Sequence, residues 1–567
     1  MVDKKKFKGS LRLDWINKDK SLYYEIDEKE NRGIKPQWVD KNDIRVSEPR
    51  ILNFVKNYGD EENDNILIRG DNLLALRTLV EQFKTREEEN KVKCIYIDPP
   101  YNTGNAFDKY DDNLKHSEWL TMMRDRLVLL KKLLRKDGVI FVQIDDKELA
   151  YLKILMDEIF GRDNFMNSIT IKPSNPVGLK MKNADKRIVR TKEFILVYAN
   201  KFDTIKLNIV YLPYENFSHY NLFLDKKGTK DNKKWKVYKV GDLIAKERGI
   251  KRSEVTEEEI KKFALKNLDN IHCSSFIADR RDRIAFSKKN PEIVTVYKNP
   301  DGSEMYMFKK RTLFPLKKRC EKVEGEFLPA EILCDLWLDI KWDGIAKEGG
   351  VTFLNGKKPE KLLKRVLELT TQEGDLVLDS FAGSGTTGAV AHKMGRKWIM
   401  IELGKHAEDL CIKRLQNVIK GDTTGISKIV NWKGGRGFKY YKLGESLISE
   451  DRTDVNWKLT YKQIAEALFY AKNFKLIENK KLEKENIFIG ENLNEKGVFA
   501  VCSVSKNLDS IGIKEYEMFI QEIKDREDFK EINLYTNKAL AVRGENQLKE
   551  VIVRKIPQTI LKKYNLI

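Results

Sequence analysis

Short apolar runs alternate with amphipathic stretches in the first part of the chain. The apolar runs are short enough to be buried parallel strands, and they lie at 66–68, 92–97, 139–142 and 194–198. Apolar residues recur at helical spacing after the first three runs, over 72–83, 117–134 and 148–159. Buried strands that alternate with helices predict an α/β domain built on a parallel sheet.

The same pattern returns near residue 352, after a long interval in which periodicity is weak. Lys358-Pro359-Glu360 begins a predicted helix, with a proline at its first position and an acid in its first turn. A strand, a glycine turn and a second strand follow, over 376–379, 381–388 and 398–401. We therefore expect two halves of one α/β domain, separated by an insertion.

Charge distinguishes the insertion from the rest of the chain. The 567 residues include 107 Lys and Arg against 87 Asp and Glu, a formal net charge of +20. Residues 201–320 contain 28 of these cations and 16 of the acids, so about a fifth of the chain carries 12 of the net charges. Such a surplus favours a polyanionic partner, although a solvated lysine-rich surface explains charge alone equally well.

Membrane, secretion and metal-site patterns do not occur in the sequence. No apolar run approaches the ~20 residues of a membrane span, and the basic beginning lacks the apolar core of a secretory signal. The six cysteines are scattered, without CxxC or zinc spacing. We expect a cytoplasmic protein with reduced thiols, no membrane partner and no metal site.

The glycine turn is the first motif that carries chemistry. Residues 383–388 fit GxGxxG after a strand, where the backbone can approach a ligand and a helix N-terminus favours anionic groups. Glu402 ends the next strand, 23 residues after Asp379, and its carboxylate suits two ribose hydroxyls. These residues alone indicate an adenosine-containing cofactor. A nicotinamide or flavin nucleotide and a purely structural turn stay open.

The second motif, Asp98-Pro99-Pro100-Tyr101, ends another predicted strand, at the edge where open α/β sheets bind ligands. The exocyclic amine of adenine is a poor nucleophile because its lone pair is delocalised into the ring. Asp98 and the Pro99 carbonyl can accept its two N–H bonds and so direct the lone pair at a methyl group. The prolines hold these acceptors rigid, and Tyr101 offers a flat face for a base taken out of the helix.

The two motifs together resemble the amino-methyltransferases that use S-adenosylmethionine. DPPY is their adenine-N6 form, and FAGSGT matches their cofactor loop. The catalytic motif comes first and the basic block lies between the two, which resembles the β-class of DNA adenine methyltransferases. Further stretches are similar to the modification (Mod) subunits of type III restriction–modification systems over roughly 60–450, among them IDPPYNTGNAFDKYDD, HSEWLTMMRDRL and LDSFAGSGTTGAVAHKMGRKWIMIELG.

This resemblance implies a domain organisation. The fold would be the Rossmann-like sheet of an S-adenosylmethionine-dependent methyltransferase with permuted motif order, plus an inserted target-recognition domain and a C-terminal α+β domain. The expected boundaries are the catalytic half at 61–203, the target-recognition domain at 204–330 and the cofactor-binding half at 331–447. The polar, mixed residues 1–60 are expected to form an N-terminal arm or wrapping segment. By elimination, the C-terminal domain at 448–567 is the candidate for contacts with a second copy or another partner.

The resemblance also implies residue roles. The target base would contact Asp98, Pro99, Pro100 and Tyr101. The cofactor would be held by Asp71, Lys358, Asp379, Phe381, Ala382, Gly383, Ser384, Gly385, Thr386 and Glu402. Lys358 would lie at its methionine end and Asp71 at its adenosine end, although a turn aspartate after Gly70 explains Asp71 equally well. The methylation needs no metal.

Cations alternate with aromatic residues in the basic block. The candidates for salt-dependent phosphate contacts are Lys233, Lys234, Lys236, Lys309, Lys310 and Arg311. A solvated basic face remains the alternative for any one of these runs. The basic segment 172–192 contains Pro and Gly and either closes over a flipped base or is an ordinary surface loop.

The expected activity is site-specific methylation of adenine N6 in duplex DNA by base flipping, as the Mod subunit of a type III system. The implied partners are duplex DNA, a second Mod copy and a separate restriction subunit, since the chain lacks the GxxxxGK[ST] loop of a motor ATPase. Alternatives are a stand-alone methyltransferase, a cytosine-N4 methyltransferase and a non-catalytic DNA-specificity subunit. An oxidoreductase inferred from the glycine turn leaves DPPY unexplained.

Overall fold

The computed structural model describes most of the chain up to residue 449. The described residues are 11–26, 34–84, 86–102, 116–173, 185, 188–276, 287–288, 291–298, 302–353, 356–449, 456, 459 and 463, together with the backbone of four later strands. Contacts divide the chain into two compact units, one formed by Met1–Asn208 with Asp335–Ile567 and the other by Ile209–Cys334. The chain therefore leaves its first unit once and returns to it.

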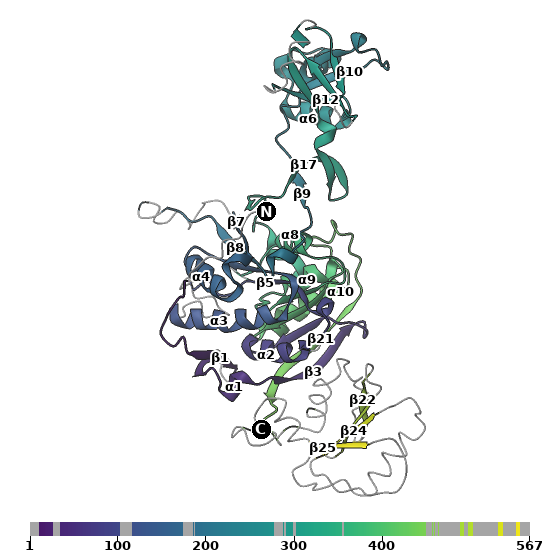
Figure 1. Ribbon diagram of the computed structural model, residues 1–567. Helices are drawn as coiled ribbons and strands as arrows, with labels where there is room; N and C mark the ends of the chain where they lie inside the picture. Colours follow the sequence, from purple (N-terminus) through teal and green to yellow (C-terminus); the bar gives the residue numbers. More distant parts are fainter. Residues whose placement is uncertain are drawn as a thin grey trace, which may run out of the picture. The chain divides into compact units, whose positions relative to one another are not determined.

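A ten-stranded sheet forms the centre of the first unit (Figure 1). Its strands are, in spatial order, β18 (Leu336–Trp337), β7 (Phe165–Ile171), β8 (Glu193–Ala199), β6 (Leu134–Ile144), β5 (Val92–Ile97), β19 (Leu376–Asp379), β20 (Lys397–Glu402), β4 (Ile66–Arg69), β21 (Gly437–Ser446) and β3 (Arg50–Gly59). The six strands from β6 to β21 run parallel, whereas β8 and β3 run antiparallel to their neighbours. The predicted α/β fold with a largely parallel sheet is confirmed.

The order of the parallel strands reverses direction in the middle of the sheet. The chain steps from β4 to β5 to β6 toward one edge, and from β19 to β20 to β21 toward the other. Right-handed crossovers then place α2, α3 and α4 on one face and α9 and α10 on the opposite face. The helices are α2 (Asn72–Phe83), α3 (His116–Leu133), α4 (Leu149–Phe160), α8 (Glu360–Thr370), α9 (Thr386–Lys393) and α10 (Lys413–Ile419).

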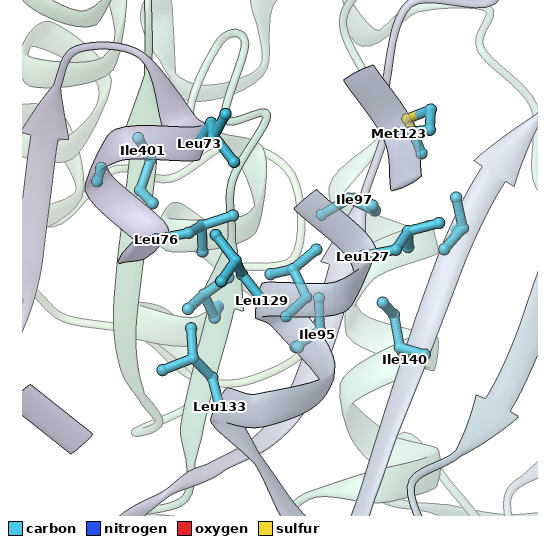
Figure 2. Packing of buried hydrophobic residues seen from close by; sticks show 14 of the residues in the cluster. Leu73, Leu76, Ile95, Ile97, Met123, Leu127, Leu129, Leu133, Ile140 and Ile401 are labelled. Atoms are coloured by element: carbon cyan, nitrogen blue, oxygen red, sulfur yellow. The ribbon is translucent and has the colours of Figure 1, made fainter. Parts of the chain in front are cut away.

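Apolar side chains from α2 and α3 pack on one face of the sheet and make the main core. Figure 2 shows Leu76 of α2 and Leu133 of α3 beside Ile95 of β5, with Leu127 near Ile140 of β6. All five side chains are almost fully buried. Burial of this kind stabilises the fold by roughly 1.5–3 kcal/mol for each large aliphatic side chain. It therefore holds the strands in place, and with them the loops at their carboxyl ends.

The described part of residues 1–60, which we expect to be an arm or wrapping segment, packs on the first unit. Strand β3 pairs with β21 at the edge of the sheet, and Figure 1 shows the purple strand beside the green one. Strands β1 (Lys20–Ile26) and β2 (Ile34–Asp40) form a hairpin. Leu22 and Tyr23 of this hairpin are buried in the main core. The hydrophobic contacts of a few isolated residues therefore join this segment to the domain.

The described part of the unit Ile209–Cys334 contains antiparallel strands together with helices α5 (Val240–Arg248) and α6 (Glu257–Lys266). A six-stranded sheet has the order β11 (Lys236–Lys239), β10 (Leu222–Asp225), β12 (Ile271–Ser275), β15 (Arg311–Pro315), β14 (Glu304–Phe308) and β13 (Thr295–Lys298). A smaller sheet contains β16 (Cys320–Val323), β17 (Glu326–Ile332) and β9 (Tyr211–Pro213). Helices α5 and α6 share a core with the larger sheet. The unit overlaps the predicted insertion at 204–330.

In the predicted C-terminal domain at 448–567, the structure describes a few residues up to 463 and, beyond them, the backbone of four strands. Strands β22 (Phe488–Asn492), β23 (Gly497–Cys502), β24 (Glu531–Thr536) and β25 (Val551–Lys555) form a mixed sheet in that order. The predicted dimer or partner contacts of 448–567 fall largely outside the described residues. Among the helices that the structure describes, none is long and apolar enough to cross a membrane.

Candidate active site

The two sequence motifs meet at the carboxyl edge of the sheet, where β5 and β19 lie side by side. These strands pair in parallel, with Leu378 opposite Ile95. Asp98 directly follows β5, and Asp379 is the last residue of β19. The strand order reverses between them, and such a reversal is where open α/β sheets bind ligands. Two motifs that are remote in sequence therefore lie together at the carboxyl ends of β5 and β19, and this location is called the crevice below.

Asp98 is the centre of a compact polar cluster. Its Oδ2 lies 2.7 Å from Nζ of Lys358, and its Oδ1 accepts a hydrogen bond of 2.8 Å from the Tyr101 hydroxyl. The ammonium group of Lys358 also lies 5.1 Å from the ring centroid of Tyr101. Burial lowers the pKa of Lys358, but the facing carboxylates of Asp98 and Glu193 outweigh it and raise that pKa. Lys358 is therefore a cation at neutral pH.

Glu193 is a member of this cluster that the sequence reasoning missed. It is the first residue of β8, and because β8 runs antiparallel to β6, its beginning lies at the edge where the parallel strands end. Glu193 Oε2 lies 2.7 Å from the Tyr101 hydroxyl and accepts a hydrogen bond of 2.6 Å from Gln143 Nε2. Burial raises the pKa of the Glu193 carboxyl. In the sequence, Glu193 is visible only as an acid at the start of an apolar run. Its place in the site follows only once the direction of β8 is known.

The backbone of the Asp98 motif is held by buried groups behind it. The Pro100 carbonyl accepts a hydrogen bond of 2.7 Å from the indole N–H of Trp119, whose side chain is fully buried. Asn102 has a φ of 56°, in the left-handed region, and its side-chain amide donates to Glu148 over 2.9 Å. Together with the fixed φ of both prolines, these contacts hold the acceptors of the motif in one geometry.

The glycine turn after β19 is organised by two carboxylates. Asp379 accepts hydrogen bonds from the Phe381 amide over 2.9 Å and the Thr387 hydroxyl over 2.5 Å. Glu402 accepts one of 2.7 Å from the Gly383 amide. Burial raises the pKa of Asp379 to about 7. Both predicted acids therefore lie at the turn and fix its shape.

A buried arginine, Arg414, forms hydrogen bonds with the glycine turn. Arg414 donates to the Thr386 hydroxyl over 2.6 Å and to Glu360 over 2.9 Å, and its Nη1 lies 3.4 Å from the Ser384 hydroxyl. The side chains of Arg414 and Glu360 are fully buried. Because a buried charge that loses its partner costs several kcal/mol, this pair holds the turn against the first residue of α8. Arg414 was not predicted, since nothing in its local sequence distinguishes it.

The residues at the turn fit an adenosine cofactor. Gly383 has a φ of 55°, and the first atom that a Cβ at this position would meet is Cε1 of Phe353 at 3.8 Å. The glycine therefore leaves room for a ligand to approach the backbone closely. Glu402 supplies a carboxylate and α9 an N-terminus beside that space, and Ala382 continues the turn. These donors and acceptors suit ribose hydroxyls and polar ends of a nucleoside.

Asp71 has structural contacts that explain it without a ligand. Its carboxylate caps α2 by accepting hydrogen bonds from the Leu73 and Leu74 amides, and it pairs with buried Arg126 over 2.9 Å. It also accepts a hydrogen bond from the Tyr24 amide over 3.0 Å. Its predicted contact with the adenosine end of a cofactor stays a prediction.

The predicted phosphate contacts lie in the unit Ile209–Cys334, at turns and strand ends. All six side chains are exposed: Lys233, Lys234, Lys236, Lys309, Lys310 and Arg311. Lys234 and Lys309 form loose ion pairs with Asp231 and Glu292, each at 3.8 Å. Nearby, the ammonium group of Lys226 lies within 4.9 Å of the rings of Trp235 and Tyr306. Exposed cations beside aromatic rings are compatible with a polyanionic ligand.

The segment 172–192, considered as a cover for a flipped base, lies largely outside the described residues. Within the described part of the chain, no group of three or more His, Cys, Asp and Glu side chains is arranged to hold a metal ion.

Comparison with known proteins shows clear relatives. The model of a family described as DNA methylase matches residues 92–413. A probable type III restriction-modification enzyme HindVI Mod subunit from Haemophilus influenzae is 36% identical over 502 residues, which is 80% of this chain and 64% of that protein. The EcoPI Mod subunit of Escherichia phage P1 is 27% identical over 59% of this chain and 56% of that protein. The chain thus spans less than two thirds of the length of these two relatives.

A third relative belongs to another kind of system by its description. The type II methyltransferase M.EcaI of Enterobacter cloacae is 29% identical over 367 residues, which is 62% of this chain and 69% of that protein. The matched family region contains both motifs of the site and the whole unit between them.

Proposed function

This chain belongs to the DNA methylase family, and from that premise we propose that it transfers a methyl group from S-adenosylmethionine to N6 of adenine in duplex DNA. The observation that carries the proposal is the pairing of β5 with β19, which brings Asp98 and the glycine turn to one crevice. A base-binding tetrapeptide and a nucleoside-binding turn at the same edge can hold an adenine amine against a methyl donor.

The residues after β5 bind and orient the target amine. The carboxylate of Asp98 and the carbonyl of Pro99 accept the two N–H bonds of N6, which directs its lone pair away from both acceptors. Tyr101 supplies the ring on which the adenine stacks. When bound, S-adenosylmethionine supplies a methyl group on a sulfonium sulfur. The new C–N bond uses the amine lone pair, the C–S electrons return to sulfur, and the surplus amine proton leaves through Asp98 to solvent.

The cations of the unit Ile209–Cys334 support duplex DNA as the substrate. Because these side chains are exposed, they can contact the phosphates of a DNA backbone. Such contacts give an affinity for DNA that falls as the salt concentration rises. We assign target recognition to this unit because it is inserted between the two halves of the catalytic sheet.

We further propose that the chain acts as the Mod subunit of a type III system, as a homodimer with a separate restriction subunit. The 36% identity to a Mod subunit supports this assignment. The likeness to M.EcaI supports the alternative of a stand-alone methyltransferase with the same site. Purification of the chain from its native host, with identification of a stoichiometric second polypeptide, distinguishes the two.

The proposal is tested by following a labelled methyl group. The protein is incubated with labelled S-adenosylmethionine and unmethylated plasmid DNA, and the DNA is digested to nucleosides and sequenced at base resolution. Label in N6-methyladenine at one short motif is expected. Label in N4-methylcytosine would contradict the choice of adenine. Absence of label, with cofactor and DNA both bound and the candidate restriction subunit added, would contradict catalysis itself.

A further inference from the structure

Lys358 contacts both groups that the target base would bind, the Asp98 carboxylate and the Tyr101 ring. Its ammonium group neutralises Asp98 over 2.7 Å, and the same nitrogen lies 5.1 Å from the Tyr101 ring centroid. A second ring, that of Trp342, lies 5.2 Å from it. An adenine that stacks on Tyr101 and donates to Asp98 would require the space and the negative charge that Lys358 now uses. The ammonium group must therefore move before the base can bind.

The position of Lys358 places it between the two motifs. Its backbone carbonyl accepts a hydrogen bond of 3.3 Å from the Thr386 hydroxyl of the glycine turn, while its side chain reaches Asp98. Pro359 and α8 follow directly and fix its backbone. The four-carbon stem of a lysine has rotatable bonds throughout, so the ammonium group can turn from one motif to the other without backbone movement.

Movement of Lys358 is costly unless another anion receives it. The side chains of Lys358 and Asp98 are only 12% and 18% exposed, and separating a largely buried ion pair leaves two poorly solvated charges. S-Adenosylmethionine has a carboxylate at its methionine end. The Lys358 backbone lies against Thr386 of the glycine turn, so the ammonium group of Lys358 can reach a ligand bound at that turn. A cofactor held at the turn would bring this carboxylate within reach of the Lys358 ammonium group, as an anion that can replace Asp98.

We propose that Lys358 is shared between Asp98 and the carboxylate of the cofactor, so that cofactor binding opens the Lys358–Asp98 ion pair and thereby admits the target base. This inference rests on the proposed function, because it takes S-adenosylmethionine and adenine as the two ligands. Lys358 is then a positioning residue that makes base binding depend on the cofactor. Coupling of this kind is reciprocal, so Asp98 must in turn weaken cofactor binding.

The reciprocal effect can be measured without DNA. Calorimetry gives the affinities of S-adenosylhomocysteine, which has the carboxylate, and of 5′-methylthioadenosine, which lacks the whole amino-acid end. We expect Asp98→Asn to tighten S-adenosylhomocysteine about fivefold or more, the lower end of usual coupling, and to leave 5′-methylthioadenosine unchanged. Lys358→Met should weaken S-adenosylhomocysteine selectively. Lys361→Met, in the first turn of α8 and paired with the exposed Asp339, is the matched control and should change neither affinity.

A double-mutant cycle separates release of Lys358 from simple charge repulsion. If Asp98 acts through Lys358, the tightening caused by Asp98→Asn disappears in the Lys358→Met background. An equal tightening in both backgrounds, or none in either, would overturn the proposal. Circular dichroism and thermal melting of each variant confirm that the comparison is between folded proteins.

The second arm measures base binding directly. A duplex carries 2-aminopurine at the adenine that the methyl-transfer experiment identifies, and its fluorescence rises when the base leaves the stack. We expect S-adenosylhomocysteine to raise the fluorescence several-fold more than 5′-methylthioadenosine in the wild type and Lys361→Met. In Lys358→Met both ligands should give the same high signal. Equal signals for the two ligands in the wild type would refute the coupling, while failure of the proposed function would show as absence of methyl transfer in the wild type.

Discussion

The crevice between β5 and β19 and the basic surface of the unit Ile209–Cys334 hold their charges in opposite ways. In the crevice, Lys358 and Asp98 are less than a fifth exposed and 2.7 Å apart. On the surface, Lys234 and Asp231 are 69% and 44% exposed and 3.8 Å apart. Buried charges are held in one geometry, which a catalytic site requires. Exposed charges each contribute little binding energy, but many of them together can attract a polyanion.

The comparison predicts that single changes in the crevice are severe. Asp98→Ala removes the carboxylate that accepts the amine and the partner of Lys358. We expect methyl transfer to fall roughly 10²–10⁴-fold, the range for loss of a positioned acid or base, with DNA affinity largely retained. Single-turnover transfer and fluorescence-anisotropy titration measure the two. Asp163→Ala, an exposed aspartate after α4, serves as control; turnover near the wild-type rate in Asp98→Ala would defeat the assignment.

Burial in the crevice also predicts a pH effect on stability. Burial raises the pKa of Asp379 to about 7, against about 3.9 in an unfolded chain. The folded protein binds the Asp379 proton more tightly than the unfolded chain does. The stability that this proton contributes is therefore fully present below about pH 4 and is lost as the pH rises to 7. Because the amide introduced by Asp379→Asn does not titrate, the free energy of unfolding of that variant relative to wild type should gain about 3–4 kcal/mol over that interval. A difference that stays constant from pH 4 to pH 8 would contradict the prediction.

The glycine turn tests whether open space in the crevice is used by a ligand. Gly383→Asp places a carboxylate in the space in front of the turn, beside Glu402. We expect the affinity for S-adenosylhomocysteine to fall about 10- to 100-fold, or about 1.4–2.7 kcal/mol. Gly374→Asp shares the positive φ and has open space around it, so it controls for backbone strain. Normal affinity in Gly383→Asp, measured by calorimetry, would place the cofactor elsewhere.

On the basic surface, the smallest effect per residue is expected. Replacing Lys233, Lys234 and Lys236 together by Ala should weaken DNA binding and reduce the slope of log affinity against log salt by about 0.9 for each phosphate that these lysines neutralise. Methyl transfer on saturating DNA should change little. Lys262→Ala, on α6 and paired with Glu258, should leave the slope unchanged. An unaltered slope in the triple variant would show that this surface is only solvated.

Local patterns in the sequence predicted the elements of the first unit closely. The predicted helix at 72–83 coincides with α2, and the predicted strand at 92–97 coincides with β5. Both are long enough, or apolar enough, for their own residues to decide the conformation. The strand predicted at 139–142 is only the buried middle of β6, because backbone pairing extends past the apolar residues.

By itself, the sequence determined the α/β alternation, the inserted basic unit, and the residues of both motifs, because each depends on spacing along the chain. Only the tertiary structure placed β5 beside β19, since strand order depends on crossovers between remote segments. It likewise brought Glu193 and Lys358 to Asp98 and Tyr101. Glu193 arrives because β8 runs antiparallel, and Lys358 because α8 begins at the same edge. Contacts between residues so distant in sequence follow from packing of the whole sheet, and no local pattern encodes them.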